Sequence, residues 1–305
     1  MSDVRRNIEL KATDQDPERS LSVSLELGAE DRGVLVQRDT YFKVPHGRLK
    51  LREEEPGGAT LVQYARADES VARLSSYRLV PVSDPDELRA ALDAALGTLV
   101  VVEKRRRLLL WENVRIHLDD VTGLGTFVEL EAVAPPGSDL EPERARVAQL
   151  SGALGIGPER ILSDSYSDRL LAAAGAEELI AAAREVMGRA YAPYSRYPVG
   201  AALRAEDGSI HVGANVENSA YPQGQCAEAS AIGALVASGR SRVVEAAVIA
   251  GADEVCVPCG GCRQRLREFM PLDATVHLCG ASGAHEAATL EELLPRSFGP
   301  EYLPG

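Results

Sequence analysis

The chain has 305 residues, a formal net charge of -13 at pH 7 and a sequence pI near 5.0. This length allows two domains with separate cores, and the acidic balance argues against a general nucleic-acid binder, whose footprint is basic. No apolar run reaches transmembrane length, and the charged N-terminal segment does not match a secretory signal. We therefore expect a cytoplasmic protein with reduced thiols and no membrane partner.

The first part of the chain alternates charged and apolar side chains, with the period of two that is typical of β-strands. The clearest such runs are residues 7–11, 49–52, 115–119 and 127–131. Helices are expected over 85–96, with Asp84 as a possible N-cap, and over 141–154. A last element of this half is expected over 163–174.

Residues 172–177 are the expected boundary between a domain over 1–174 and a second domain over 177–305. Beyond the boundary, helices and strands alternate, which is typical of a layered α/β domain. A helix is expected over 179–191, and two more after Cys226 and Cys259. The expected strands of this half are 199–204, 211–215, 246–250 and 275–278.

The charges of the first half are sorted in a way that suggests a ligand. The carboxylates are Glu9, Glu129 and Glu131, and the cations are Lys11, Lys50, Arg52, Arg66, Lys104, Arg106 and Arg115. If the strands close into an antiparallel barrel with these faces inward, the lumen suits a polyphosphate with magnesium or manganese, because cations neutralise phosphate and carboxylates hold the metal. The alternative is that each strand has one solvated face.

Five phrases of this half resemble, in order, the motifs of the CYTH family, the triphosphate tunnel enzymes that include adenylyl cyclases and thiamine triphosphatases. The phrases are residues 7–11, 39–52, 115–119, 125–131 and 165–168. The resemblance implies a tunnel-shaped β-barrel with magnesium at the carboxylates, triphosphate at the cations and triphosphate hydrolysis as the activity. Nucleotide cyclisation and nucleotide sensing without catalysis remain alternatives. Asn7 stands where the family has a first glutamate.

The second half carries Cys226, Cys259 and Cys262, and two cysteines separated by two residues with a third far upstream follow a zinc-ligand pattern. Helix N-termini, where these cysteines are expected, favour thiolates. Three ligands leave a fourth position open for water, as a catalytic zinc requires. Glu228 then fits the proton carrier of a zinc deaminase. The alternatives are a closed four-cysteine site that includes Cys256, and an ordinary first-turn glutamate.

Residues 178–305 resemble the small three-cysteine cytidine deaminases, which are homotetramers with an α/β/α layered fold and a mixed sheet. The matching phrases are residues 194–201, 215–218, 226–228, 258–264 and 293–300. The resemblance implies that the residues that bind the substrate are Asn215, Glu217, Tyr197, Ala227 and Phe298. Asn215 and Glu217 would hold the ribose hydroxyls, and Phe298 would reach the pocket of a neighbouring subunit.

Two positions depart from that family. Tyr197 stands where a phenylalanine is usual, and Ala229 stands where many members have an arginine that offsets thiolate charge. The expected function is a bifunctional enzyme whose partners are a cytosine nucleoside and a triphosphate, both serving one pyrimidine nucleotide pathway. A modified cytosine nucleoside as substrate, a regulatory first half and a zinc-stabilised scaffold remain alternatives.

Overall fold

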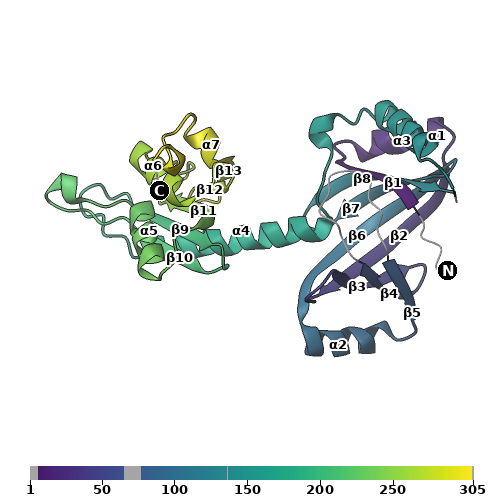
Figure 1. Cartoon of the computed structure of the whole chain (residues 1–305), viewed down its shortest axis with the longest axis horizontal. Helices are drawn as coiled ribbons and strands as arrows, with labels where there is room; N and C mark the ends of the chain where they lie inside the picture. The colour runs from purple at the N-terminus through teal and green to yellow at the C-terminus, as the bar shows by residue number, and fades with distance from the viewer. Residues whose placement is uncertain (1–5, 65–76, 136, 304–305) are drawn as a thin grey trace. The chain divides into compact units, whose positions relative to one another are not determined.

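The computed structural model describes residues 6–64, 77–135 and 137–303. The chain forms two compact units, which divide between Leu171 and Ala172, so the expectation of two domains is confirmed (Figure 1). Among the described helices, none is both long and apolar enough to cross a membrane. Arg66 lies outside the described residues.

The N-terminal unit is an antiparallel sheet with helices at its margins. Its elements are β1 (Arg6–Thr13), α1 (Pro17–Glu26), β2 (Glu30–Phe42), β3 (Arg48–Glu55), β4 (Ala59–Tyr64), β5 (Tyr77–Val82), α2 (Pro85–Leu96), β6 (Thr98–Trp111), β7 (Val114–Val121), β8 (Gly125–Ala134), α3 (Glu141–Ala153) and the short helix Pro158–Arg160. The expected cap of α2 is present, because Asp84 accepts a hydrogen bond from the backbone of Glu87.

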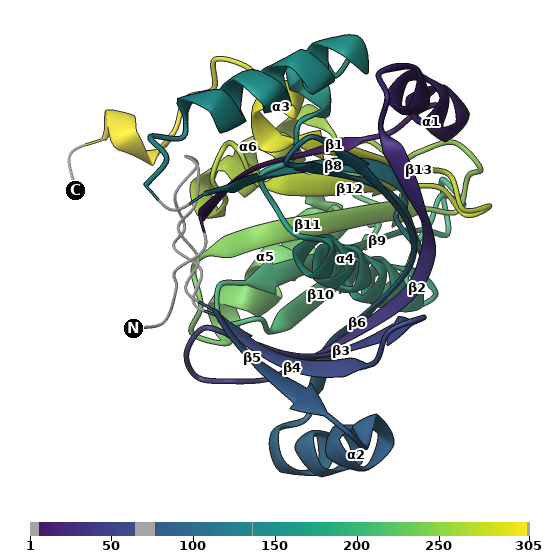
Figure 2. The ribbon, with the colours of Figure 1, turned by 90° about the vertical axis from the view of Figure 1, so that its right-hand side faces the viewer.

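The closed barrel expected for this unit is not confirmed. The eight strands run in the order β1-β8-β7-β6-β2-β3-β4-β5, so β1 and β5 are the two edges of the described sheet. Figure 2 shows the strands bent into an open arc, with α1 and α3 outside it. The right-handed twist of long antiparallel strands curves a sheet in this way, but only hydrogen bonds between its edge strands would close it.

The two faces of the sheet differ in character. Apolar side chains of β1, β6, β7 and β8 pack with α1 and α3 on the outer face, around Leu109, Ile116, Leu130 and Leu150. Strand residues of the opposite parity point into the arc, and they carry the predicted carboxylate and cation ligands that the structure describes. The expected inward orientation of the charged face is therefore the one observed, although the sheet is open.

The C-terminal unit has helices on both faces of a five-stranded sheet. Its elements are β9 (Val199–Ala205), β10 (Ile210–Ala214), the short helix Tyr221–Gln223, α5 (Ala227–Ala237), β11 (Val243–Ala250), α6 (Gly260–Phe269), β12 (Thr275–Cys279), β13 (His285–Thr289), α7 (Leu290–Leu293) and the short helix Pro300–Tyr302. The strand order is β10-β9-β11-β12-β13; β11 and β12 are parallel and the other pairs antiparallel, so the expected mixed sheet is confirmed.

Helix α4 (Tyr166–Met187) joins two segments that were expected separately, an element over 163–174 and a helix beginning at 179. The alanine-rich residues 172–177 continue the helix because alanine is the strongest helix former and no proline interrupts them. Leu179 and Ala183 of α4 pack on one face of the C-terminal sheet. Helices α5 and α6 pack on the other face.

A close backbone contact fixes where α5 begins. A Cβ added to Gly213 of β10 would lie 2.2 Å from the nitrogen of Ala231 and 2.5 Å from the carbonyl oxygen of Ala227. Only glycine permits this approach. The first turn of α5, which carries Cys226 and Glu228, is therefore held directly against the sheet.

Candidate functional site

Three thiols meet where two helices of the C-terminal unit begin. Cys226 is the N-cap of α5, Cys259 is the N-cap of α6, and Cys262 lies in the first turn of α6, as expected. Their Sγ atoms all lie within 4.8 Å of one another, and those of Cys226 and Cys259 are 4.0 Å apart. Two sulfurs on one tetrahedral zinc are separated by about 3.8 Å, since each Zn–S bond is about 2.3 Å. The three-sulfur donor set therefore fits zinc.

Glu228 places a carboxylate beside these thiols. It is the second residue of α5 and only 4 % exposed, and its Oε2 accepts a hydrogen bond from the Cys262 thiol at 3.2 Å. The unpaired amides at a helix N-terminus stabilise negative charge at this position. A buried carboxylate next to three metal-ligating atoms can accept and return a proton without exchanging it freely with bulk water.

The surroundings of the thiols change how readily they ionise. Burial raises the pKa of Cys226, and burial together with the Glu228 carboxylate raises the pKa of Cys262. Burial also opposes ionisation of Cys259, but hydrogen bonds from the backbone and thiol of Cys262 leave its pKa below the ordinary value. A cation among the three sulfurs is what would make all of them thiolates.

Cys256 does not join the three-thiol group, which is the only such cluster of ligand atoms among the described residues. Burial, followed by the nearby Glu228, raises the pKa of the Cys256 thiol to about 11. The geometry therefore favours three sulfur ligands over the four-cysteine alternative. Cys279 is buried on β12, as expected.

Asn215 and Glu217, expected at the ribose, hold a loop in this structure. The amide of Asn215 accepts a hydrogen bond from the backbone of Val199 at 2.9 Å and donates one to the carbonyl of Tyr197 at 3.0 Å. Glu217 accepts a hydrogen bond from the backbone of Tyr194 at 2.8 Å. Both side chains therefore fix the segment that carries Tyr197, and their other lone pairs and hydrogens are available in principle to hydroxyl groups.

The remaining expected substrate residues differ in exposure. Burial and the nearby Cys256 raise the pKa of Tyr197, and the residue is 42 % exposed. Ala227 is fully buried at the start of α5. Phe298 is 56 % exposed and stacks on Tyr302, with ring centroids 5.3 Å apart. Phe298 thus extends an apolar surface outward from this unit.

Ala229 is uncharged and cannot offset the charge of the thiolates. The contacts of Arg263, in the first turn of α6, show whether that arginine does so instead. Arg263 donates hydrogen bonds to the carbonyl oxygens of Pro258 and Leu293, at 2.7 and 2.8 Å. These bonds hold the loop before Cys259 and the end of α7. In this geometry Arg263 supports the backbone around the site.

The cations of the N-terminal unit gather on the inner face of the arc, where two buried aspartates pair with them. Asp39 accepts from Lys50 at 2.6 Å and from Arg52 at 2.8 Å. Asp119 pairs with Arg106 at 2.6 Å and Lys104 at 3.3 Å. The structure therefore brings four of the predicted phosphate ligands together.

This crowding changes the charges available. Burial opposes ionisation of Asp39, yet Lys50 and Arg52 hold its pKa well below the ordinary value. Burial and the neighbouring Arg106 lower the pKa of Lys104 to about 7. A polyanion entering this face would therefore meet a lysine that is only partly protonated at neutral pH.

The three expected magnesium ligands are engaged with cations or an amide. Glu129 pairs with Lys11 at 3.3 Å and with Arg106 at 2.6 Å, and Glu131 pairs with Arg115 at 3.3 Å. Asn7 donates a hydrogen bond to Glu131 at 2.8 Å. Burial and the adjacent Glu129 raise the pKa of Glu9 to about 7. No three carboxylates in the described part of the chain bring their oxygens within 4.8 Å of one another, so these residues do not form a ready magnesium site.

Four residues of this face received no role from the sequence. They are Asp39, Asp119, His117 and Tyr166. The hydroxyl of Tyr166 donates to Asp119 at 3.0 Å, and Lys11 lies over its ring at 4.4 Å from the centroid. The available signal was strand parity, because Asp119 and His117 alternate with apolar residues in the same run as Arg115.

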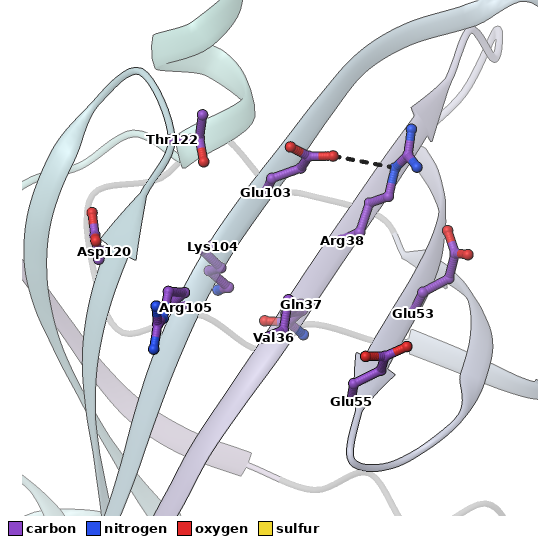
Figure 3. A pocket seen from close by; sticks show the side chains of 10 residues that line it. All are labelled: Val36, Gln37, Arg38, Glu53, Glu55, Glu103, Lys104, Arg105, Asp120 and Thr122. Carbon is purple, nitrogen blue, oxygen red and sulfur yellow. Dashed lines mark ion pairs between the residues drawn. The ribbon is translucent and has the colours of Figure 1, made fainter.

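A cavity of about 460 Å³ lies on the opposite face of the same strands (Figure 3). Arg38, Glu103 and Arg105 line it from positions that alternate with Asp39 and Lys104, and Arg38 pairs with Glu103 at 3.7 Å. In Figure 3 the Lys104 side chain lies behind its strand. Lys104 also lines this cavity, but Lys50, Arg52 and Arg106 do not, so the cavity differs from the surface on which the predicted phosphate ligands gather.

Comparisons with known proteins match the two units separately. The family model of the CYTH domain matches residues 5–166, and that of the cytidine and deoxycytidylate deaminase zinc-binding region matches residues 174–278. A cytidine deaminase of Sporosarcina psychrophila is 43% identical over 127 residues, 42% of this chain and 93% of that protein. A cytidine deaminase of Halalkalibacterium halodurans is 43% identical over 41% of this chain and 95% of that protein. A solved cytidine deaminase structure from Burkholderia pseudomallei is 36% identical, covering 40% of this chain and 98% of that one, with a TM-score of 0.39.

Proposed function

The chain belongs to the CYTH family through residues 5–166 and to the cytidine deaminase family through its C-terminal unit, and from this premise we propose that it hydrolytically deaminates cytidine, deoxycytidine or a related cytosine nucleoside. One observation carries the proposal. A buried carboxylate, that of Glu228, touches a group of three thiols whose spacing fits zinc. The net reaction consumes water and a cytosine base and yields a uracil base and ammonia.

Zinc held by Cys226, Cys259 and Cys262 would supply an activated water as the nucleophile. Glu228 would take up a proton at its carboxylate, deliver it to the ring nitrogen of the base, and carry the next proton to the departing amine. Its burial at the first turn of α5 keeps the carboxylate in place through both transfers. The contact between Gly213 and the first turn of α5 keeps the same carboxylate from shifting relative to the sheet.

For the nucleoside, we keep Asn215 and Glu217 as ribose ligands, with Tyr197, Ala227 and Phe298 around the substrate. The loop bonds described above support this assignment, because they fix the position of Tyr197. The unit also presents several exposed aromatic rings. They are Tyr191, Tyr194, Tyr197, Tyr221, Phe298 and Tyr302. Exposed apolar surface of this kind is typical of interfaces, which supports a homo-oligomer, with a tetramer as the state to test by sedimentation.

The test of the deaminase is ammonia release from a panel of cytosine nucleosides, with and without phosphates and including modified bases, by the zinc-loaded protein. Release from cytidine or deoxycytidine is the expected result. If only a modified nucleoside reacts, the proposed substrate is wrong but the proposed hydrolytic deamination is supported. If no member of the panel reacts while zinc is bound at one equivalent, the proposal is wrong.

For the N-terminal unit, we propose binding of a triphosphate on the inner face of the sheet, followed by its magnesium-dependent hydrolysis. The support is the convergence of Lys50, Arg52, Lys104 and Arg106 on one face. Arginine and lysine groups of this kind neutralise phosphate oxygens. For hydrolysis, Glu129 and Glu131 would exchange their present cation partners for a metal ion.

A second candidate, binding without hydrolysis, is favoured by a specific observation. Glu131 accepts a hydrogen bond from Asn7 and forms an ion pair with Arg115. Glu129 forms ion pairs with Lys11 and Arg106. A metal ion would have to displace these partners. The unit would then sense a nucleotide and adjust deamination in place of catalysing a second reaction.

Phosphate release from inorganic triphosphate and nucleoside triphosphates, with magnesium or manganese, separates the two candidates. Lys50→Met with Arg52→Met should abolish release and leave deamination unchanged if the unit is an independent enzyme. Altered deamination by triphosphate, lost in the same double variant, supports sensing. Arg105→Met, on the outer face, is the matched control.

The state of the thiols supports a location. All five cysteines are free thiols, and zinc binding requires the reduced form. We therefore propose that the chain works in a reducing compartment such as the cytoplasm.

A further inference from the structure

Two histidines meet at the edge of the C-terminal sheet, in a place that the deaminase chemistry does not use. His277 lies on β12 and His285 on the edge strand β13. His277 Nδ1 and His285 Nε2 are 3.0 Å apart, and the ring centroids are 5.2 Å apart. His277 is buried and His285 is exposed, so a small solute can reach the pair from one side.

The far nitrogen of His277 is already committed. Its Nε2 lies 3.0 Å from Glu245 Oε1, and a carboxylate can only accept a hydrogen bond. In the neutral imidazole the hydrogen is therefore on Nε2, and Nδ1 presents its lone pair toward His285. Glu245 is held in turn by Arg204 at 3.0 Å.

Arg204 connects this group to helix α4. The same guanidinium donates to the carbonyl oxygen of Gly175 at 2.6 Å and pairs with Glu178 at 3.2 Å. The orientation of His277 is therefore fixed through two further residues on neighbouring elements. A carboxylate that orients a histidine from behind is the usual outer partner of a metal-binding imidazole.

From this geometry we propose that His277 Nδ1 and His285 Nε2 form a second metal site, distinct from the three-cysteine site, for a divalent transition-metal ion such as zinc or nickel. Imidazole nitrogens are good ligands for these ions. Two nitrogens on one tetrahedral ion lie about 3.3 Å apart, since each bond is about 2.0–2.1 Å. The observed separation of 3.0 Å is close to this value. Water completes the coordination, and the bound ion links β13 to β12.

The test uses the full-length protein already loaded with one equivalent of zinc. Calorimetric titration with nickel chloride should show one further ion bound per chain, with zinc retained in the protein. His285→Gln should weaken nickel binding by at least about tenfold, and Glu245→Gln by about 10–100-fold. His211→Gln, at a histidine on β10 that contacts Ser209, is the matched control and should bind nickel like the parent chain.

A thermal melt gives an independent reading. Nickel should raise the melting temperature of the zinc-loaded chain and of His211→Gln, but not that of His285→Gln, because an ion that binds only the folded state stabilises it. No nickel binding by the parent chain, or equal binding by His285→Gln and the parent, would overturn the proposal and leave the two imidazoles as a hydrogen-bonded pair. Neither reading depends on deamination, so failure here leaves the deaminase proposal intact.

Discussion

The two candidate sites of this chain differ in how their charges are balanced. On the inner face of the N-terminal sheet, Arg106 already pairs with Asp119 and Glu129. At the start of α5 and α6, the three thiols and Glu228 bring hydrogen-bond acceptors and acids together, and no lysine or arginine of the described residues is hydrogen-bonded to them. In the first site the side chains neutralise one another, whereas the thiols and carboxylate of the second site would be neutralised by a bound cation.

Because of this difference in charge balance, a ligand must displace existing ion pairs at the first site but not at the second. A polyphosphate must exchange partners with buried carboxylates, and each exchange costs desolvation and broken ion pairs. A metal at the thiols replaces the thiol protons, including the one that Cys262 donates to Glu228, and it adds three metal–sulfur bonds. We therefore expect the deaminase site to depend on single ligands and the charged face to depend on a network.

The largest expected effect is on the deamination rate and comes from changing Glu228. Glu228→Gln should lower the deamination rate by about 10²–10⁴-fold, because it removes the group that transfers protons. Zinc content should stay at the parent level, since the three sulfurs are untouched. Glu268→Gln, an exposed glutamate on α6, is the control and should deaminate normally. Turnover by Glu228→Gln that equals the control would remove Glu228 from its assigned role.

The next effect tests the network. Arg106→Met should lower the free energy of unfolding of the N-terminal unit by about 3–5 kcal/mol, because Asp119 and Glu129 lose a buried partner. Arg105→Met changes the neighbouring residue on the outer face and should cost less than about 0.5 kcal/mol. Denaturant unfolding with a probe in the N-terminal unit measures both. Similar stabilities for the two variants would show that the inner-face pairs contribute little.

A smaller effect tests how the backbone holds the deaminase site. Gly213→Ala should destabilise the C-terminal unit by about 1–3 kcal/mol, because the new methyl overlaps Ala231 and Ala227 of α5. It should also weaken zinc binding, since Cys226 moves with that turn. Gly233→Ala, inside α5 with open space around it, should raise stability by about 0.5–1 kcal/mol. The same sign for both substitutions, in thermal melts, would contradict the packing account.

The smallest effect concerns pH at the charged face. Burial and Arg106 lower the pKa of Lys104 to about 7, and burial and Glu129 raise the pKa of Glu9 to about 7. As pH rises from 6 to 8, Lys104 loses its positive charge and Glu9 gains a negative one. Both changes weaken binding of an anion.

Inorganic triphosphate, titrated without metal at pH 6 and pH 8, checks this sign. Affinity of the parent chain should fall on the order of tenfold more than that of Lys104→Met, which is a difference of about 1.4 kcal/mol. Comparing the two proteins cancels the titration of the ligand itself. Parallel pH profiles would show that Lys104 keeps one charge state across this range.

The sequence predicted the deaminase site better than the charged face, for a physical reason. Cys226 and Cys259 could be placed at helix starts because capping is set by residues that are neighbours in the chain. The pairing of Asp39 with Lys50 and Arg52 depends on the register between β2 and β3, which alternation alone does not give.

Two features of the fold escaped prediction in the same way. Whether β1 and β5 join is a property of the whole sheet, so strand patterns could not decide between a barrel and the open arc. The run 172–177 is short and made of small residues, which suggested a boundary, yet its alanines continue α4 through the division between the units. The composition of residues 172–177 suggested that the first core ends there. The backbone of these residues nevertheless stays helical, because alanine favours the helix.

The central claim is that zinc is held by three sulfurs with one position open, beside Glu228. X-ray absorption at the zinc edge, on protein loaded with one equivalent of zinc, tests it most directly. The account predicts three sulfur neighbours at about 2.3 Å and one oxygen or nitrogen at about 2.0–2.1 Å. Four sulfur neighbours, with Cys256 as the fourth, would contradict it.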